Sequence, residues 1–205
     1  GSQLQFVNQG ELTVLAGSTM SGGLTQTAGV ATILGTLNGN VLLQGGLLKG
    51  TGTIAGNVSN SGGIFAPGTS PGTLTLNNYT QTAGDLVLEI DGDAPALRDH
   101  LIILGNGNFY GGRIVLDFSD YTGSGAVSFA NILEVSGTLR LAHPATGSAA
   151  AIEVIGLAPG RQATAAWDGK TLGVSLVSAV PEPGSYALLL AGLGLIGLAS
   201  ARRRR

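Results

Sequence analysis

The chain of 205 residues combines 35 glycines with 43% hydrophobic and 11% charged residues, and it contains no cysteine. This composition argues against intrinsic disorder, which pairs low hydrophobicity with high net charge, and it excludes a fold held by disulfides. The formal net charge is −2, and residues 1–201 hold 6 Lys and Arg against 12 Asp and Glu. We expect no nucleic-acid partner, because this part of the chain offers no basic patch.

Residues 3–84 are almost free of charge, since Glu11 and Lys49 are their only charged side chains. Thr, Ser, Asn, Gln and Gly surround short apolar pairs, and glycine-led segments such as Gly23-Leu24-Thr25 and Gly35-Thr36-Leu37 recur. Glycine and β-branched residues interrupt every helical stripe, which disfavours helices. The pattern predicts short strands separated by turns.

A repeated pentapeptide favours stacking of these strands. Thr25-Gln26-Thr27-Ala28-Gly29 returns as Thr80-Gln81-Thr82-Ala83-Gly84, 55 residues later. We expect residues 1–84 to form the repeats of a parallel β-helix, or β-solenoid, in which each rung buries its inward Leu, Ile or Val against the next. Equivalent positions would then lie about 4.8 Å apart, where like charges repel, and this explains the scarcity of charge.

Residues 48–74 contain a Gly-Thr-Gly-x-Ile-x-Gly-Asn-Val run followed by Ala-Pro-Gly-x-Ser-Pro-Gly-Thr-Leu. With these motifs, the segment of about residues 35–92 resembles the repeat of autotransporter passenger domains and other large bacterial adhesins. The resemblance implies a right-handed parallel β-helix. The turn dipeptides Pro67-Gly68 and Pro71-Gly72 agree with it, because they would bend the chain at two corners of a coil.

From Asp85 the pattern changes to amphipathic strands. Residues 85–91 and 113–118 alternate with a period of two, which predicts one dry and one wet face. Asp168-Gly169 is a tight-hairpin signal. We expect residues 85–178 to cap the solenoid with antiparallel strands, because an uncapped end leaves apolar surface and strand edges open. Further strands are expected at Leu101–Leu104, Asn131–Val135, Gly137–Leu141, Ala151–Ile155, Ala163–Trp167 and Thr171–Val177.

The densest polar cluster runs from Glu89 to His100. Within it, Asp91 and Asp93 are weak candidates for binding a hard cation such as calcium. The other ligands of an EF-hand loop are missing, and a polar turn between strands is the alternative interpretation. We therefore expect neither a metal nor a cofactor.

No other constellation predicts catalysis. His100 and His143 lack metal-type spacing, and no Gly-x-Ser-x-Gly elbow is present. Trp167 is interpreted as a packing residue, with a sugar-stacking platform as the alternative. The sequence thus predicts a protein that is not an enzyme and has no catalytic residues.

The C-terminal tail has three parts in a fixed order. A linker at residues 179–183 contains Val180, Pro181, Glu182 and Pro183, and the 18 residues from Gly184 to Ala201 carry no charge. The chain then ends in Arg202, Arg203, Arg204 and Arg205. At about 1.5 Å per residue the uncharged run spans roughly 27 Å, near the thickness of the hydrocarbon core. We expect residues 184–205 to form one transmembrane helix with an arginine stop in the cytoplasm, and the preceding chain to be exported.

The tail resembles the PEP-CTERM sorting signal of bacterial exported proteins. The resemblance implies an exosortase, a membrane-embedded protease, as partner, with Val180–Pro183 as the processing motif and Arg202–Arg205 as the anchor stop. Pro181 and Pro183 suppress helix and keep this backbone accessible. A signal peptide encoded upstream of Gly1 is also expected.

Together these features predict an all-β, exported structural protein of the cell surface or extracellular matrix. The resemblance implies an association with biofilm and exopolysaccharide, and localisation at the envelope before and after processing. The expected partners are the exosortase, membrane lipid through the C-terminal helix, and an exopolysaccharide. A polysaccharide-binding or polysaccharide-cleaving β-helix module and a passenger-type adhesin are the alternatives.

Overall fold

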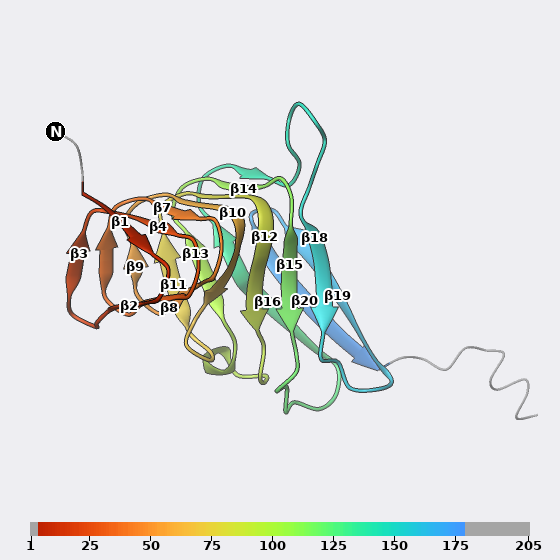
Figure 1. Cartoon of the computed structure of the whole chain (residues 1–205). Coiled ribbons are helices and arrows are strands. Elements are labelled where there is room, and N and C mark those ends of the chain that lie inside the picture. Colours follow the sequence, from red (N-terminus) through yellow and green to blue (C-terminus); the bar gives the residue numbers. More distant parts are fainter. Residues whose placement is uncertain (1–3, 179–205) are drawn as a thin grey trace, which may run out of the picture.

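Two sheets hold the strands of residues 4–178, the part of the chain that the computed structural model describes (Figure 1). The predicted all-β class is confirmed, since the helical content of this part is the single 3-10 turn η1 (Pro95–Leu97). In chain order the strands are β1 (Gln5–Asn8), β2 (Glu11–Val14), β3 (Thr19–Ser21), β4 (Gly23–Gln26), β5 (Val30–Ile33), β6 (Thr36–Asn38), β7 (Val41–Leu43), β8 (Leu47–Gly50), β9 (Thr53–Ile54), β10 (Val58–Pro67), β11 (Thr73–Leu76), β12 (Tyr79–Glu89), β13 (His100–Ile103), β14 (Gly107–Phe109), β15 (Arg113–Asp117), β16 (Val127–Val135), β17 (Leu139–Arg140), β18 (Ala151–Ile155), β19 (Arg161–Asp168) and β20 (Thr171–Ser178).

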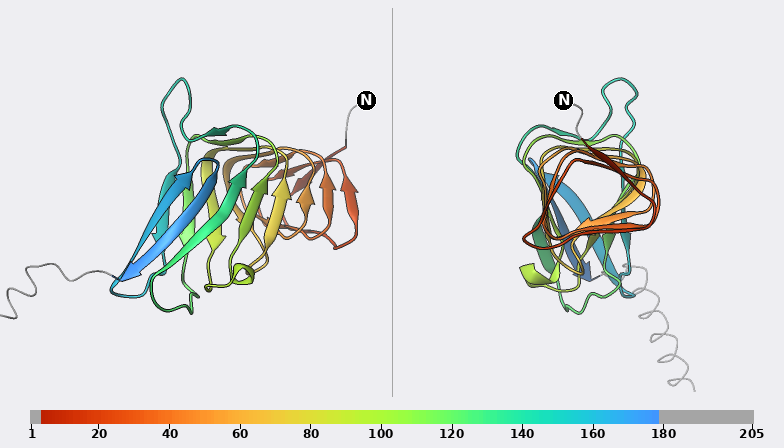
Figure 2. Two further views of the ribbon diagram at one scale, coloured as in Figure 1. Left: turned by 180° about the vertical axis from the view of Figure 1, so that it is seen from behind. Right: turned by 60° about the vertical axis from the view of Figure 1, so that its left-hand side comes forward.

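The chain returns to the same sheet position after every third strand. β1 pairs with β4, β2 with β5 and β3 with β6, all in parallel, and the next three strands repeat this order. We call one such passage a coil; Figure 2 shows the coils superimposed when they are viewed end-on. Val30, Leu47 and Ile64 are paired on successive coils, 17 residues apart. The predicted parallel pairing is therefore confirmed.

Alternate side chains of these strands fill the inside of the coils. Leu24, Ile33 and Leu37 are among many aliphatic residues with no exposed surface. Farther along the axis the filling becomes aromatic: the ring centroids of Phe65, Tyr79, Phe109 and Trp167 follow each other at 5.4, 5.6 and 5.6 Å. The core is thus one continuous column through the stacked coils.

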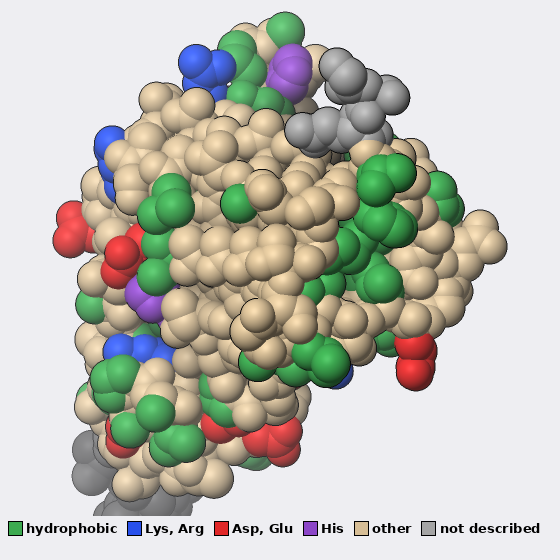
Figure 3. Space-filling model, turned by 90° about the vertical axis from the view of Figure 1, so that its left-hand side faces the viewer, with side chains coloured by type: hydrophobic (Ala, Val, Ile, Leu, Met, Phe, Trp, Pro, Cys, Tyr) green, Lys and Arg blue, Asp and Glu red, His purple; other side chains and the backbone are tan. Residues whose placement is uncertain are grey.

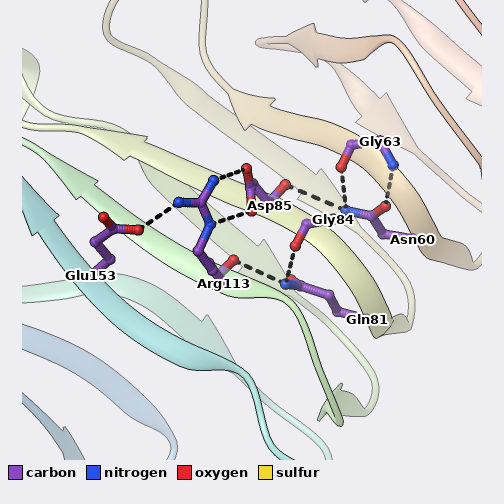
Figure 4. Close-up of polar contacts among 7 residues, drawn as sticks. All are labelled: Asn60, Gly63, Gln81, Gly84, Asp85, Arg113 and Glu153. Atoms are coloured by element: carbon purple, nitrogen blue, oxygen red, sulfur yellow. Dashed lines mark hydrogen bonds and ion pairs between the residues drawn. The ribbon is translucent and has the colours of Figure 1, made fainter.

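The repeated pentapeptide marks one corner of the coil. Through the parallel pairings, Gln26, Leu43, Asn60 and Gln81 occupy one row, and the three amides are buried. Each amide donates to a backbone carbonyl just ahead of it. Gln26 donates to Ala28 at 2.7 Å. Asn60 donates to Gly63 and Gln81 to Gly84, both at 3.1 Å (Figure 4). The buried amides therefore supply hydrogen bonds where the backbone leaves the sheet ladder.

Antiparallel strands follow the parallel ones at the C-terminal end. β20 pairs antiparallel with both β16 and β19, and the predicted hairpin is confirmed, because Asp168 pairs with Thr171 across Gly169 and Lys170. Gly169 has a φ of 61° there, which suits glycine. Parallel pairing also runs past residue 85, since β12 pairs with β15 and β15 with β18.

The opposite end of the described chain exposes apolar side chains. Leu4, Phe6 and Leu15 are 70%, 40% and 62% exposed. Figure 3 views this end and shows hydrophobic side chains gathered on it, with most of the charged side chains in view toward the margins. Glu11 and Lys49 are the only charged residues before Asp85, so the charges concentrate on the later coils.

Candidate functional site

One outer surface of the coils brings together charged and aliphatic side chains. It is formed by β2, β5, β8, the second halves of β10 and β12, β15 and β18, and we call it the lateral face. The pairings place one outward row of residues on it: Glu11, Val30, Leu47, Ile64, Asp85, Arg113 and Ala151. The row is aliphatic over β5, β8 and β10 and ionic over β12 and β15.

In the ionic part of the lateral face, the charged side chains of neighbouring strands pair with one another. Arg113 donates from Nε and Nη2 to the two carboxylate oxygens of Asp85, at 2.9 and 2.6 Å, and from Nη1 to Glu153 at 2.7 Å (Figure 4). Hydrogen bonds to Asp85, reinforced by Glu153, raise the pKa of the Arg113 guanidinium further above its usual range. This cation is therefore engaged within the fold.

The aliphatic part is hollowed on both sides of Lys49. A hollow of about 370 Å³ extends from Lys49 toward β12, and one of about 220 Å³ extends toward β2. The first is lined by Leu47, Lys49, Ile64, Ala66, Pro67, Gly68, Thr69, Ser70, Val87, Glu89 and Asp99. The second is lined by Glu11, Leu12, Thr13, Val30, Thr32 and Lys49. Lys49 is thus common to both, and it forms no ion pair with another residue of the described range.

The two carboxylates at the β12 end of the larger hollow are held by hydrogen bonds. Asp99, only 1% exposed, accepts the backbone N–H of Gly72 and of Glu89, each at 2.9 Å. Glu89 accepts the hydroxyl of Ser70 at 2.9 Å. Burial raises the pKa of the Asp99 carboxyl to about 7, although its two N–H donors act in the opposite direction. These groups fasten the loop before β11 to the end of β12.

The two candidate cation ligands, Asp91 and Asp93, do not line these hollows, although Glu89 and Asp99 of the same polar cluster line the larger one. Asp91 and Asp93 follow β12 in a loop, where Asp93 accepts a hydrogen bond from the Tyr121 hydroxyl. Burial, with Glu89 next in effect, raises the pKa of Asp91. Among residues 4–178, no group of three or more His, Cys, Asp or Glu side chains is placed to hold a metal ion.

The remaining candidates occupy ordinary structural positions. Nε2 of His100 on β13 lies 3.3 Å from a carboxylate oxygen of Glu134, and His143 packs edge-on against Tyr110 in a loop. Trp167 packs on Phe109, which agrees with its interpretation as a packing residue. None of these side chains lines the hollows beside Lys49.

Sequence reasoning noticed Lys49 as a rare charge but did not identify it as a site residue. The signal lay in the 17-residue spacing, which places Thr32, Lys49 and Ala66 side by side on adjacent strands. The positions paired with Lys49 on the two adjacent strands are therefore uncharged, and neither supplies a carboxylate. Arg113, in contrast, lies opposite Asp85.

Within residues 4–178 we find no helix that is long and apolar enough to cross a membrane. The predicted processing motif at Val180, Pro181, Glu182 and Pro183, the predicted helix at 184–205 and its terminal arginines lie outside the described residues.

Comparison with known proteins identifies this C-terminal segment. A family model described as the PEP-CTERM protein-sorting motif matches residues 179–205. Neither the curated proteins nor the solved structures gave a match. The chain therefore carries a PEP-CTERM sorting motif, which indicates an exported, cell-envelope-associated protein that is processed by an exosortase.

Proposed function

We propose that the protein is a non-enzymatic structural component of the cell surface or extracellular matrix, associated with biofilm exopolysaccharide. Residues 184–205 hold it in the membrane as one helix until an exosortase acts near Val180–Pro183. The part before the tail is then a β-solenoid delivered to the outer surface or matrix. The matched sorting motif at residues 179–205 is the observation that carries this proposal.

The exported part suits a structural role. Its backbone is paired from coil to coil, and the early coils have almost no charged side chains. Asp99 and Glu89, the carboxylates of the larger hollow, are engaged with the backbone and with Ser70. A general acid or base has to reach substrate, so this engagement favours a scaffold over a glycoside-cleaving enzyme.

The test is maturation of the full chain in its native host. We expect deletion of Arg202–Arg205, or Glu182→Ala, to change the mass of the mature protein and its partition between membrane and released fractions. Arg140→Ala, which removes an exposed arginine on β17, is the control and should mature normally. Unchanged mass and partition after both tail changes would contradict the sorting role.

A polysaccharide-binding module is the second candidate. The observation that favours it is the pair of hollows meeting at Lys49 on the lateral face. Incubation of the protein with acidic and neutral polysaccharides separates the possibilities. Retention without turnover indicates a binding module, and turnover would contradict the non-enzymatic assignment.

A further inference from the structure

We propose that the lateral face binds an extended glycan in which one acidic sugar is flanked by neutral sugars, with the Lys49 ammonium pairing with the sugar carboxylate. The proposal rests on the function proposed above, because it names the polymer class that the exported protein would contact. It concerns the surface from β2 to β12.

Lys49 is the cation that this surface leaves available. Its side chain is half-buried between the two hollows and has no carboxylate partner among residues 4–178. The paired positions on the adjacent strands are Thr32 and Ala66, which are uncharged. An ammonium without a carboxylate partner in the described part of the fold can pair with an anion that comes from outside it.

The surface around Lys49 has the composition of a shallow sugar site. Val30, Leu47 and Ile64 form an aliphatic row, of which Ile64 is 44% exposed, and these side chains can pack on the C–H faces of sugar rings. The hydroxyls of Thr32 and Ser70 border the row. Adjacent strands are about 4.8 Å apart, close to the length of one hexose in an extended chain, so successive sugars would meet successive coils.

The acidic residues at the two ends restrict the ligand. Glu11 on β2 lines the smaller hollow and Glu89 on β12 lines the larger one, so each lies two strands from Lys49. That separation is about 10 Å along the stack of coils. A polymer with a carboxylate on every sugar would bring negative charges toward both glutamates, and the like charges would repel. The two glutamates therefore restrict the ligand to a glycan with a single acidic sugar, which pairs with Lys49.

An acidic peptide fits this surface less well. Peptides that add to a sheet use the free N–H and C=O groups of an edge strand. The strands β5, β8 and β10 beneath the hollows are instead paired on both sides. A ligand here has to bind through side chains alone, which suits the ring faces and hydroxyls of a glycan.

Affinity electrophoresis of the full-length protein in detergent tests the proposal. The probes are gellan, with one glucuronate per repeat of several sugars, polygalacturonate, with a carboxylate on every sugar, neutral dextran, and polyglutamate. We expect gellan to retard the protein most. Lys49→Met, which keeps the length of the side chain, should weaken gellan binding at least about tenfold, the loss expected for one charge-assisted hydrogen bond.

Two further variants sharpen the test. Lys170→Met alters the only other lysine of the chain, on the β19–β20 hairpin, and should leave gellan binding unchanged. Glu11→Gln should strengthen binding to polygalacturonate several-fold, because it removes one of the repelling charges. Circular dichroism of each variant confirms that the fold is retained.

Several results would overturn the proposal: equal gellan binding by the wild type and Lys49→Met, no retention by any probe, or retention by polygalacturonate, dextran or polyglutamate as strong as by gellan. These outcomes leave the sorting role intact if the tail changes still alter maturation in the native host. Failure of that maturation test, with Lys49-dependent gellan binding preserved, would instead remove the sorting role alone.

Discussion

The early and late coils of the same stack reach stability by different means. From β4 to β8 the paired residues are 17 apart, the core is aliphatic and Lys49 is the only charged side chain. Aromatic rings enter the core at Phe65 on β10. From β12 onward Asp85 and Arg113 are paired 28 residues apart, and the outer row carries ions. Short coils leave no room for loops, whereas the long coils carry loops such as the one containing η1.

Close approach of the backbone explains the regularity of the early coils. A Cβ added to Gly39 would lie 2.1 Å from the carbonyl oxygen of Gly22, and one added to Gly56 would lie 2.2 Å from that of Gly39. A side chain at these positions would force neighbouring coils apart. The 17-residue repeat of glycine is thus a packing requirement of the stacked corner.

The largest expected effect is therefore from Gly39→Ala. The added methyl group collides with backbone that cannot move without displacing a coil, so we expect the free energy of unfolding to fall by about 3 kcal/mol, the upper range for overpacking. Gly10→Ala is the matched control, because nothing lies within 4 Å of the added Cβ. Urea unfolding of both variants measures the difference, and equal stabilities would contradict the close-packed corner.

The second prediction compares equivalent amides in the two regions. Gln81 donates to the carbonyls of Gly84 and Arg113 and accepts from the Tyr79 hydroxyl, all within the core wall. Gln81→Leu leaves these groups without a partner, and we expect a loss of about 3 kcal/mol. Gln26→Leu should cost about 1 kcal/mol, because water can reach both of its partners, the half-buried Asn8 and the exposed Ala28.

Urea unfolding is again the measurement, with Gln44→Leu as the control because Gln44 is exposed. Equal losses for the variants of Gln26 and Gln81 would show that the position of the coil in the stack does not decide the cost of a buried amide.

The parallel stacking could be predicted because short coils repeat similar residues at short, regular intervals along the sequence. The repeated pentapeptide of Gln26 and Gln81 and the turn at Gly169 are local signals that the structure explains directly. The hollows around Lys49 could not be predicted, since their walls come from β2, β5, β8, β10 and β12 and depend on register. The ion pairs of Arg113 join residues 28 and 40 positions apart, which no local pattern reveals.

Titration of Asp99, which follows β12, should make the stability of the fold depend on pH. Its pKa of about 7 in the folded state lies above the usual value of 3.8, so the folded state binds this proton more tightly. Its contribution to stability is complete below about pH 4 and is lost as the pH rises through about 7. We expect thermal unfolding to show a loss on the order of 2 kcal/mol between about pH 5 and 7.

Asp99→Asn should remove this dependence. The Asp99→Asn variant should be less stable than the wild type at every pH, because the NH₂ group of the asparagine faces the N–H of Gly72 or Glu89, which is also a donor. The slope of stability against pH should nevertheless become flat over this range. Asp168→Asn, which changes an exposed carboxylate of the β19–β20 hairpin, is the control and should retain the slope. A slope that persists in Asp99→Asn would assign the titration to another group.

The smallest effect is expected from Arg113→Met, because exposed ion pairs contribute little to stability. The variant leaves Asp85 and Glu153 without the cation between them, so β12, β15 and β18 should exchange amide hydrogens faster at low salt. The difference should shrink as salt rises, because the Debye length falls from about 10 Å at 0.1 M to about 3 Å at 1 M. The coils from β4 to β8, whose only charged side chain is Lys49, should show no such change. If the faster exchange of Arg113→Met is independent of salt, the arginine acts through the packing of its stem, and ion pairing does not distinguish the late coils from the early ones.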